Sequence, residues 1–318
     1  MTTYVIRRVL MAVAVLVLVS LVAFFVMRLL PGDPISLKLA ESQVVALNEE
    51  QLAAVKHEYG LDRPLVVQYF TWLGGVLKGD FGTSILSRGP VADEMWRRLP
   101  VTLHIGLLAF IIGTAIGALA GVLCAVKRGR WVDGLVTALA NVGITMPTFW
   151  LGVMLVYLFG LNLGWLPTQG YTSPFTDFWQ STKQLIMPVF CLALFPLAGT
   201  TRQTRSSMLE VLGLDYVRTA WSKGLKGRVV ILKHALKNAL IPVVTLSGMS
   251  LTMVVGGSVV IEMVFNIPGI GRMLVTAINN QDYPVVQAVV FLIAALVVII
   301  NLIIDLSYGW LDPRIRYN

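Results

Sequence analysis

Six long apolar runs divide this 318-residue chain and constrain its fold more than any other feature. They lie at residues 9–30, 101–126, 135–161, 185–200, 239–264 and 285–308. Each is near the ~20 residues that a helix needs to cross a hydrocarbon core of about 30 Å. The mean hydropathy of +0.77 and the charged fraction of 13% also differ from those of soluble globular domains. The sequence therefore predicts an all-α integral membrane protein with six transmembrane helices.

Two apolar segments need a separate interpretation. The first run follows Arg7 and Arg8, as in a secretory signal, but it is longer than a signal core and no small-residue cleavage pattern follows it. We expect it to be a retained first span. The stretch Leu65–Leu77 has only 13 residues and is flanked by charged residues, so it is too short to span. It predicts a helix that lies on the membrane surface.

The basic residues lie between the apolar runs and predict an orientation. If the N-terminus is cytoplasmic, all four inner segments are basic: Arg7 and Arg8, the turn at 127–130, the loop 202–238 and the C-terminal tail. Residues 31–100 then lie outside, where nine acids outnumber seven bases. The predicted organisation is a tail and first span (1–30), a small external subdomain (31–100) and a transmembrane core (101–318), with both termini cytoplasmic.

Composition and motifs argue against several other classes of protein. The formal net charge of +8 does not indicate nucleic-acid binding, because the bases separate apolar runs and form no single patch. Cys124 and Cys191 each lie inside an apolar run, without the spacing of a zinc site or a disulfide framework. No Gly-x-x-x-x-Gly-Lys-Ser/Thr loop occurs, so the chain lacks the motif that cradles ATP phosphates.

Helix-breaking residues fall inside three of the runs. They are Pro147 in the third run, Pro188 and Pro196 in the fourth, and Gly248, Gly256 and Gly257 in the fifth. In lipid such residues need close neighbouring helices, so they predict a tightly packed, kinked bundle. A gating role and ordinary small-residue packing both remain open.

The stretch DYVRTAWSKGLKGRVVILKHALKNALIP, residues 215–242, places a basic helical pattern between two apolar runs. Asp215 predicts an N-cap, Gly224 ends the first short helix, and a second helix begins near Gly227. One face of the first helix is apolar and consists of Tyr216, Val217, Ala220 and Trp221. An apolar face in an aqueous loop usually meets a partner. The alternative is that the bases only fix the membrane orientation.

Several motifs carry a resemblance to a known family. Ala220, Gly224 and Leu236 match the cytoplasmic signature Glu-Ala-Ala, three residues, Gly, nine residues, Ile-x-Leu-Pro, although the other signature positions differ. With LPGDP, GDFGTSILSRGPVADEM, VFNIPGIGRML and DPRIRYN, the segment resembles the dipeptide and oligopeptide branch of bacterial ABC-importer permeases, which depend on a binding protein. The resemblance covers essentially the whole chain.

The resemblance implies a type I ABC importer permease fold in the bacterial inner membrane. It implies a transport subunit that is not itself an enzyme, forms half of a path for di- or oligopeptides and binds no cofactor. A second permease, two cytoplasmic ATPases that use ATP and an external binding protein would be its partners. The implied ATPase-coupling residues are Asp215, Tyr216, Val217, Arg218, Thr219, Ala220, Trp221 and Gly224.

Two further sites are predicted, one for docking of the binding protein and one for the translocation path. The resemblance implies that the loop Ile267, Pro268, Gly269 and Ile270, with residues 31–100, docks the binding protein; a local turn without a partner is the alternative. Candidates for the translocation path on the broken third and fifth spans are Met146, Met249, Thr252 and Met253, although methionine also fills cores.

The ionisable residues and the missing catalytic motifs argue against two other classes of membrane protein. An ion-coupled secondary transporter buries such groups at mid-membrane, but Glu262, Asp305 and His104 lie toward the ends of runs, where we expect snorkelling or interfacial solvation to explain them. An intramembrane protease needs a nucleophile with a base or a metal pair, and no His-Glu-x-x-His occurs. Importers of the same family for glutathione, nickel chelates or sugars remain open, because the binding protein makes most of the selection.

Overall fold

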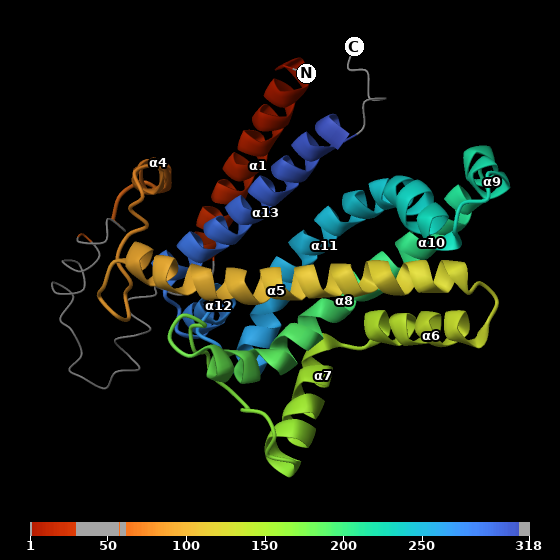
Figure 1. The fold of residues 1–318 in the computed structure, drawn as a ribbon. Coiled ribbons are helices and arrows are strands. Elements are labelled where there is room, and N and C mark those ends of the chain that lie inside the picture. The colour runs from red at the N-terminus through yellow and green to blue at the C-terminus, as the bar shows by residue number, and fades with distance from the viewer. Residues whose placement is uncertain (1, 30–56, 58–61, 312–318) are drawn as a thin grey trace.

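The computed structural model describes residues 2–29, 57 and 62–311, and helices dominate them (Figure 1). In chain order the helices are α1 (Thr2–Leu29), α4 (Leu65–Leu77), α5 (Val91–Val126), α6 (Trp131–Thr145), α7 (Thr148–Leu155), α8 (Phe178–Leu212), α9 (Asp215–Ser222), α10 (Gly227–Val229), α11 (Leu236–Val264), α12 (Ile270–Asn279) and α13 (Tyr283–Leu311). Two π-helical segments, η1 (Val156–Asn162) and η2 (Val230–Ala235), continue α7 and precede α11.

The predicted all-α fold with six spans is confirmed, with one span in two pieces. Among the described residues, α1, α5, α8, α11 and α13 each contain a segment long and apolar enough to cross a membrane. Counted as one span, α6 and α7 with η1 make the sixth; the two helices meet at an angle of 101°. The bend lies at Pro147, and Met146 before it is extended (φ −76°, ψ 125°) because a residue preceding proline avoids the helical region.

Elsewhere the helices differ from the predicted runs. Pro188 and Pro196 lie inside α8, which continues unbroken from the predicted span into residues 202–212. The predicted loop 202–238 is therefore mostly helical, and α12 forms where only a tight loop was expected. The surface helix α4 has the predicted bounds. Residues 31–56 and 58–61 of the predicted external subdomain lie outside the described residues.

The core is built on a very close approach of α5 to α8. Three glycines of α5, spaced four residues apart, face the backbone of α8, as expected for small residues at membrane helix interfaces. A Cβ atom added to them would lie 2.5–2.6 Å from a carbonyl oxygen of α8, in the pairs Gly113 with Ala193, Gly117 with Leu197 and Gly121 with Thr201. The predicted tight packing is thus present, although in α5, where it was not expected.

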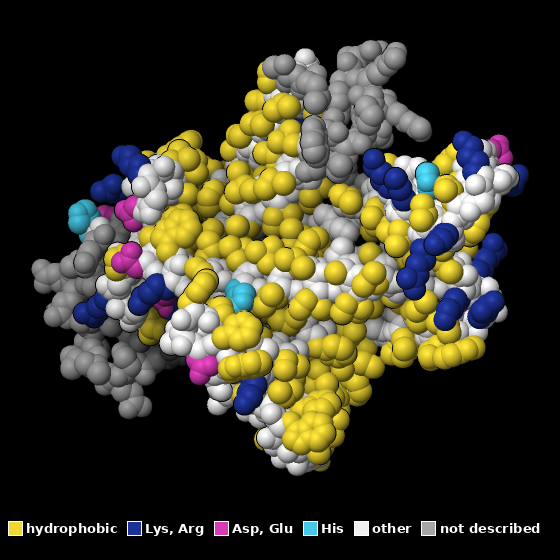
Figure 2. Space-filling model, viewed as in Figure 1, with side chains coloured by type: hydrophobic (Ala, Val, Ile, Leu, Met, Phe, Trp, Pro, Cys, Tyr) yellow, Lys and Arg dark blue, Asp and Glu magenta, His cyan; other side chains and the backbone are white. Residues whose placement is uncertain are grey.

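The two ends of the bundle differ in character. The α9 end comprises α9, α10 and the turn that joins α5 to α6, and Lys and Arg side chains gather there at the right of Figure 2. The α12 end comprises α4, α12 and residues 79–90, toward the left of Figure 1. Between the two ends, exposed apolar side chains cover much of the visible surface (Figure 2). Such a belt between polar ends is typical of a protein that spans a membrane.

Candidate coupling and translocation sites

Helix α9 is anchored to the bundle through part of its predicted apolar face. Val217 and Ala220 are buried, with 0% and 6% of their surfaces exposed. They pack in one cluster with residues from α5, α8, η2 and α11, namely Ala125, Met208, Val211, Val230, Ala235 and Ala239. Val217 and Ala220 therefore face the chain's own core and not solvent, and their part in ATPase coupling stays a prediction.

The other two members of that face remain accessible. Tyr216 and Trp221 are 40% and 48% exposed. The hydroxyl of Tyr216 donates to the carbonyl oxygen of His234 (3.3 Å) and accepts from Nδ2 of Asn238 (2.7 Å). The Trp221 ring lies against Gly227, where an added Cβ would be 3.2 Å from the ring. Both aromatic side chains are thus held in place by the following segment while part of each surface stays open.

The polar side of α9 is solvated. Asp215 is the first helical residue and not the predicted N-cap, since Leu214 occupies that position without a side-chain cap. Its carboxylate still favours the helix through the macrodipole. Arg218 lies 3.4 Å from the Asp215 carboxylate, and the hydroxyl of Thr219 donates to the Asp215 carbonyl oxygen. Because the ion pair is exposed, it contributes little stability.

Gly224 allows the chain to turn after α9. Its φ is +73°, a left-handed conformation that side chains with a Cβ disfavour. An added Cβ would meet no atom within 4 Å. Within this chain, glycine is required here for backbone conformation and not for close packing.

The predicted docking loop is largely internal. Ile267 and Ile270 are 0% and 1% exposed, Gly269 is buried, and Pro268 is half-buried. A side chain on Gly269 would collide with the carboxylate of Glu262. Only Pro268 of the four retains an open surface, so a direct contact by all four residues with a partner is excluded in this arrangement.

Glu262 explains why this loop is enclosed. Its Oε1 accepts from the Thr102 hydroxyl (2.7 Å), and its Oε2 accepts from the backbone N–H of Arg272 (2.9 Å). The Thr102 oxygen accepts in turn from the N–H of Ile270 (2.8 Å). A buried carboxylate from α11 therefore caps the N-terminus of α12. The earlier interpretation of Glu262 as an interfacial, solvated group is wrong, since the residue is 1% exposed.

The other ionisable groups named for ion coupling are also engaged. Asp305 of α13 forms an ion pair with Arg8 of α1 at 2.7 Å. Nδ1 of His104 lies 3.0 Å from the hydroxyl of Tyr171. Each group has a structural partner in the described part of the chain.

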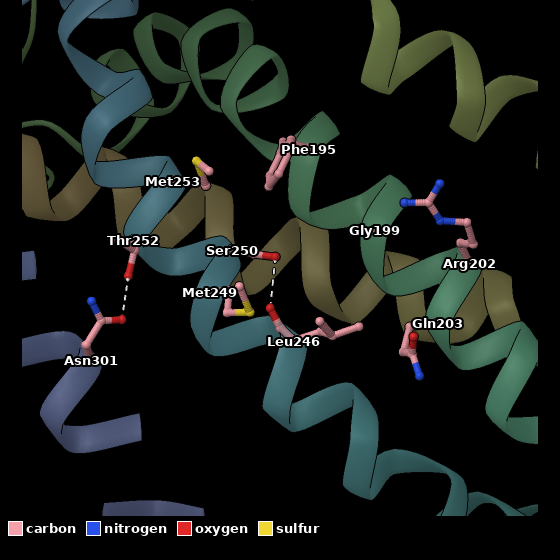
Figure 3. Close-up of a pocket in the computed structure, with 10 residues that line it drawn as sticks. All are labelled: Phe195, Gly199, Arg202, Gln203, Leu246, Met249, Ser250, Thr252, Met253 and Asn301. Carbon is pink, nitrogen blue, oxygen red and sulfur yellow. Dashed lines mark hydrogen bonds between the residues drawn. The ribbon is translucent and has the colours of Figure 1, made fainter. Parts of the chain in front are cut away.

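A groove of about 440 Å³ lies between α8, α11 and α13 (Figure 3). Three of the four predicted path residues, Met249, Thr252 and Met253, line it. The two methionines are 62% and 63% exposed, so they do not fill a core. Met146 does not line this groove.

The sequence analysis missed the polar lining of the same groove. Arg202 and Gln203 of α8 and Asn301 of α13 contribute to it. The carboxamide oxygen of Asn301 accepts from the Thr252 hydroxyl (3.3 Å). The amide of Asn301 inside a strongly apolar run was the available sign, because polar groups within a span usually face other helices or a water-filled cavity.

The helices, the basic end and the groove together define a multi-pass membrane protein of the transporter type. Residues 117–317 match the family described as "Binding-protein-dependent transport system inner membrane component", and residues 1–106 match the description of its N-terminal region. The chain belongs to this family of permease components of ABC importers.

Individual proteins are similar over their full length. The chain is 41% identical to the oligopeptide transport system permease protein AppB of Bacillus subtilis over 320 residues, with 100% of both chains covered. It is 39% identical to the dipeptide transport system permease protein DppB of Alkalihalophilus pseudofirmus and 42% identical to the glutathione transport system permease protein GsiC of Salmonella paratyphi A, again with 100% of each covered.

A solved structure supports the fold. An inward-facing form of the MetNI methionine ABC transporter matches with a TM-score of 0.57 and 20% identity, over 69% of this chain and 96% of that one. The likeness confirms the type I importer permease fold.

Proposed function

We propose that this chain is the permease subunit of an ATP-driven importer for di- or oligopeptides. Together with a second, homologous permease it forms the translocation path, and an external binding protein delivers the substrate. The names of the oligopeptide and dipeptide relatives support the substrate class. The chain acts as a transport component without an ATPase site of its own and binds no cofactor.

The observation that carries the proposal is that one side of α9 packs into the bundle while the other side stays exposed. Its buried side, through Val217 and Ala220, contacts the ends of α5, α8 and α11. Its open side presents Tyr216 and Trp221. A partner that grips the open side can therefore move three spans together. We assign the open side to one of two cytoplasmic ATPases, whose nucleotide-driven closure would rock these spans between outward and inward openings.

The α12 end is assigned to the binding protein in a revised form. The contact is supplied by Pro268 together with residues 31–100. The buried neighbours of Pro268 hold it in position, namely Ile267, Gly269 and Ile270. Neighbouring Asn266 is exposed and its side chain donates to Oε1 of Gln169 (3.1 Å), which ties the loop to residues 163–177. A rigid surface suits docking because little ordering is needed on binding.

The proposal includes an orientation in the bacterial inner membrane with both termini cytoplasmic. The gathering of Lys and Arg at the α9 end supports it (Figure 2). A cysteine at position 226 should resist an impermeant maleimide in cells with a permeable outer envelope, whereas one at position 93 should react. The reverse labelling pattern would invert the topology.

Uptake by reconstituted vesicles tests the function itself. With the cognate ATPases inside and the binding protein outside, labelled tri-alanine should accumulate only when ATP is enclosed. Uptake that needs no ATP and is abolished by an ionophore would show an ion-coupled transporter instead. Because the glutathione permease is also 42% identical, glutathione is the second candidate substrate, and preferential uptake of labelled glutathione would favour it.

A further inference from the structure

We propose that Arg202 binds the free carboxylate of the peptide while it passes through the groove between α8, α11 and α13. The inference rests on the proposed import of peptides and names the substrate group that the groove selects. The groove, at about 440 Å³, is within the range of small-ligand sites. In Figure 3, Arg202 and Gln203 lie on the α8 side, across from Leu246 and Met249 of α11.

Among the described residues, none pairs with the charge of Arg202. No ion pair or hydrogen bond joins its side chain to another group in the described part of the protein. Arg205, three residues further along α8, shows the opposite case, because its Nε and Nη2 donate to the two carboxylate oxygens of Asp133 at 2.7 and 2.9 Å. Arg205 thus links α8 to α6 through an ion pair, whereas Arg202 lines the groove with a guanidinium that is unpaired among the described residues.

The remaining lining fits one end of a peptide and not the other. The described residues contribute no acidic side chain to the groove, so they offer a peptide ammonium no counter-charge there. The polar groups of Thr252 and Ser250 are already bonded, to Asn301 and to the Leu246 carbonyl oxygen. A guanidinium binds a carboxylate through two parallel hydrogen bonds. Phe195 and the exposed methionines Met249 and Met253 offer adaptable apolar contact to varied side chains.

Paired substrates test the proposal in the complete reconstituted importer. Labelled tri-alanine and its C-terminal amide are compared at saturating binding protein, so that differences in delivery are removed. Arg202→Gln should lower the maximal uptake rate of the free acid roughly tenfold, the smallest loss expected when a hydrogen bond to a charged group is removed. It should leave uptake of the amide and the binding-protein-stimulated hydrolysis of ATP unchanged.

Two variants separate recognition from charge alone. Arg202→Lys keeps the charge without the two-pronged geometry, and an intermediate rate for the free acid is expected. Lys226→Gln removes a base that does not line the groove, and both peptides should be unaffected. An equal loss of both peptides in Arg202→Gln, no loss, or a parallel loss of ATP hydrolysis would overturn the proposal.

Protection of a cysteine from maleimide tests the carboxylate site without requiring transport. Failure to import tri-alanine would contradict the proposed function, but this binding measurement could still be made. In a Met249→Cys variant, millimolar tri-alanine should slow maleimide labelling at least threefold more than its amide does. Cys124 and Cys191 are buried and contribute little background. Loss of this difference in Arg202→Gln supports the carboxylate site, and equal protection by the acid and the amide refutes it.

Discussion

The α12 end and the α9 end of the bundle each contain a short, glycine-containing motif, and the two motifs have opposite roles. At the α12 end, Gly269 is required because no side chain fits beside the Glu262 carboxylate. At the α9 end, Gly224 has open space around it and is required because φ is positive. The first motif is packed inside the protein against Glu262, whereas the second follows α9, whose open side is exposed.

This difference shows that a distinctive motif does not by itself identify a partner surface. The loop Ile267 to Ile270 is distinctive because a buried carboxylate, a hydroxyl and a helix N-terminus must fit together there. The stretch around α9 is distinctive because one side packs inward and the other remains open. Variants should therefore affect folding at the α12 end and coupling at the open side of α9.

The largest effect is expected at Glu262. Glu262→Ala leaves the Thr102 hydroxyl and the Arg272 N–H without an acceptor in a buried site, which should cost about 2–4 kcal/mol. The purified protein should unfold at a lower temperature in detergent and accumulate poorly in the membrane. Glu262→Gln retains one acceptor oxygen and should lose less. An unfolding temperature equal to that of the parent in Glu262→Ala would show that α12 does not depend on this cap.

The second prediction separates the two sides of α9. Val217→Asp places a charge where the parent side chain is 0% exposed, so it should detach α9 and lower stability by about 3 kcal/mol or more. Trp221→Asp changes a side chain that is 48% exposed and should leave the unfolding temperature within error.

Association with the ATPases gives the complementary measurement. Trp221→Asp should weaken it by about 2 kcal/mol, roughly thirtyfold, as expected for a buried aromatic anchor of an interface. Co-purification and ATP-dependent uptake both report on this step. If Trp221→Asp assembled and transported at the parental rate, the open side of α9 would not be the coupling surface.

The third prediction concerns the turn after α9. Gly224→Val introduces a β-branched residue at a φ of +73° and should cost about 1–2 kcal/mol of local strain. Since the space is empty, the variant should insert normally and lose several-fold in the uptake obtained per ATP hydrolysed. Gly224→Asn tolerates the left-handed conformation and should behave nearly as the parent. An equal defect in both variants would indicate that close contact with a partner, and not φ, requires the glycine.

The sequence predicted the fold because hydropathy over long runs depends little on tertiary detail. It also located α9, whose ends are marked by local residues such as Gly224. It failed where the outcome depends on three-dimensional neighbours. Helix α8 extends beyond the predicted run at both ends, and Glu262 proved buried although it lies near the end of a run. Position along a run gives depth in the membrane, whereas burial depends on which helix packs beside it.

For the same reason, the sequence predicted only some of the residues that line the groove. Met249, Thr252 and Met253 line the groove, but Arg202 was assigned only to membrane orientation. A basic residue near the end of a span satisfies the positive-inside rule whether or not it faces a groove. Only the packing of α8 against α11 and α13 distinguishes the two roles.

The smallest effect is expected for Lys226→Gln, at the same turn as Gly224. Lys226 is exposed and precedes α10, and its side chain forms no cap. Its carbonyl oxygen accepts from the N–H groups of Val229 and Val230 (2.8 and 3.2 Å), which any residue at this position can provide. Stability should change by less than about 0.5 kcal/mol.

Because several other bases remain at the α9 end, loss of this one should not alter the orientation either. Peptide uptake and ATP hydrolysis should stay within about twofold of the parent, since a single exposed charge contributes little to most interfaces. A tenfold loss of uptake with normal insertion would show that the partner covers the turn as well as α9. The partner surface at the α9 end would then include the backbone around Gly224 as well as the exposed aromatic residues. The α9 end would contrast more strongly with the enclosed α12 end than Tyr216 and Trp221 alone indicate.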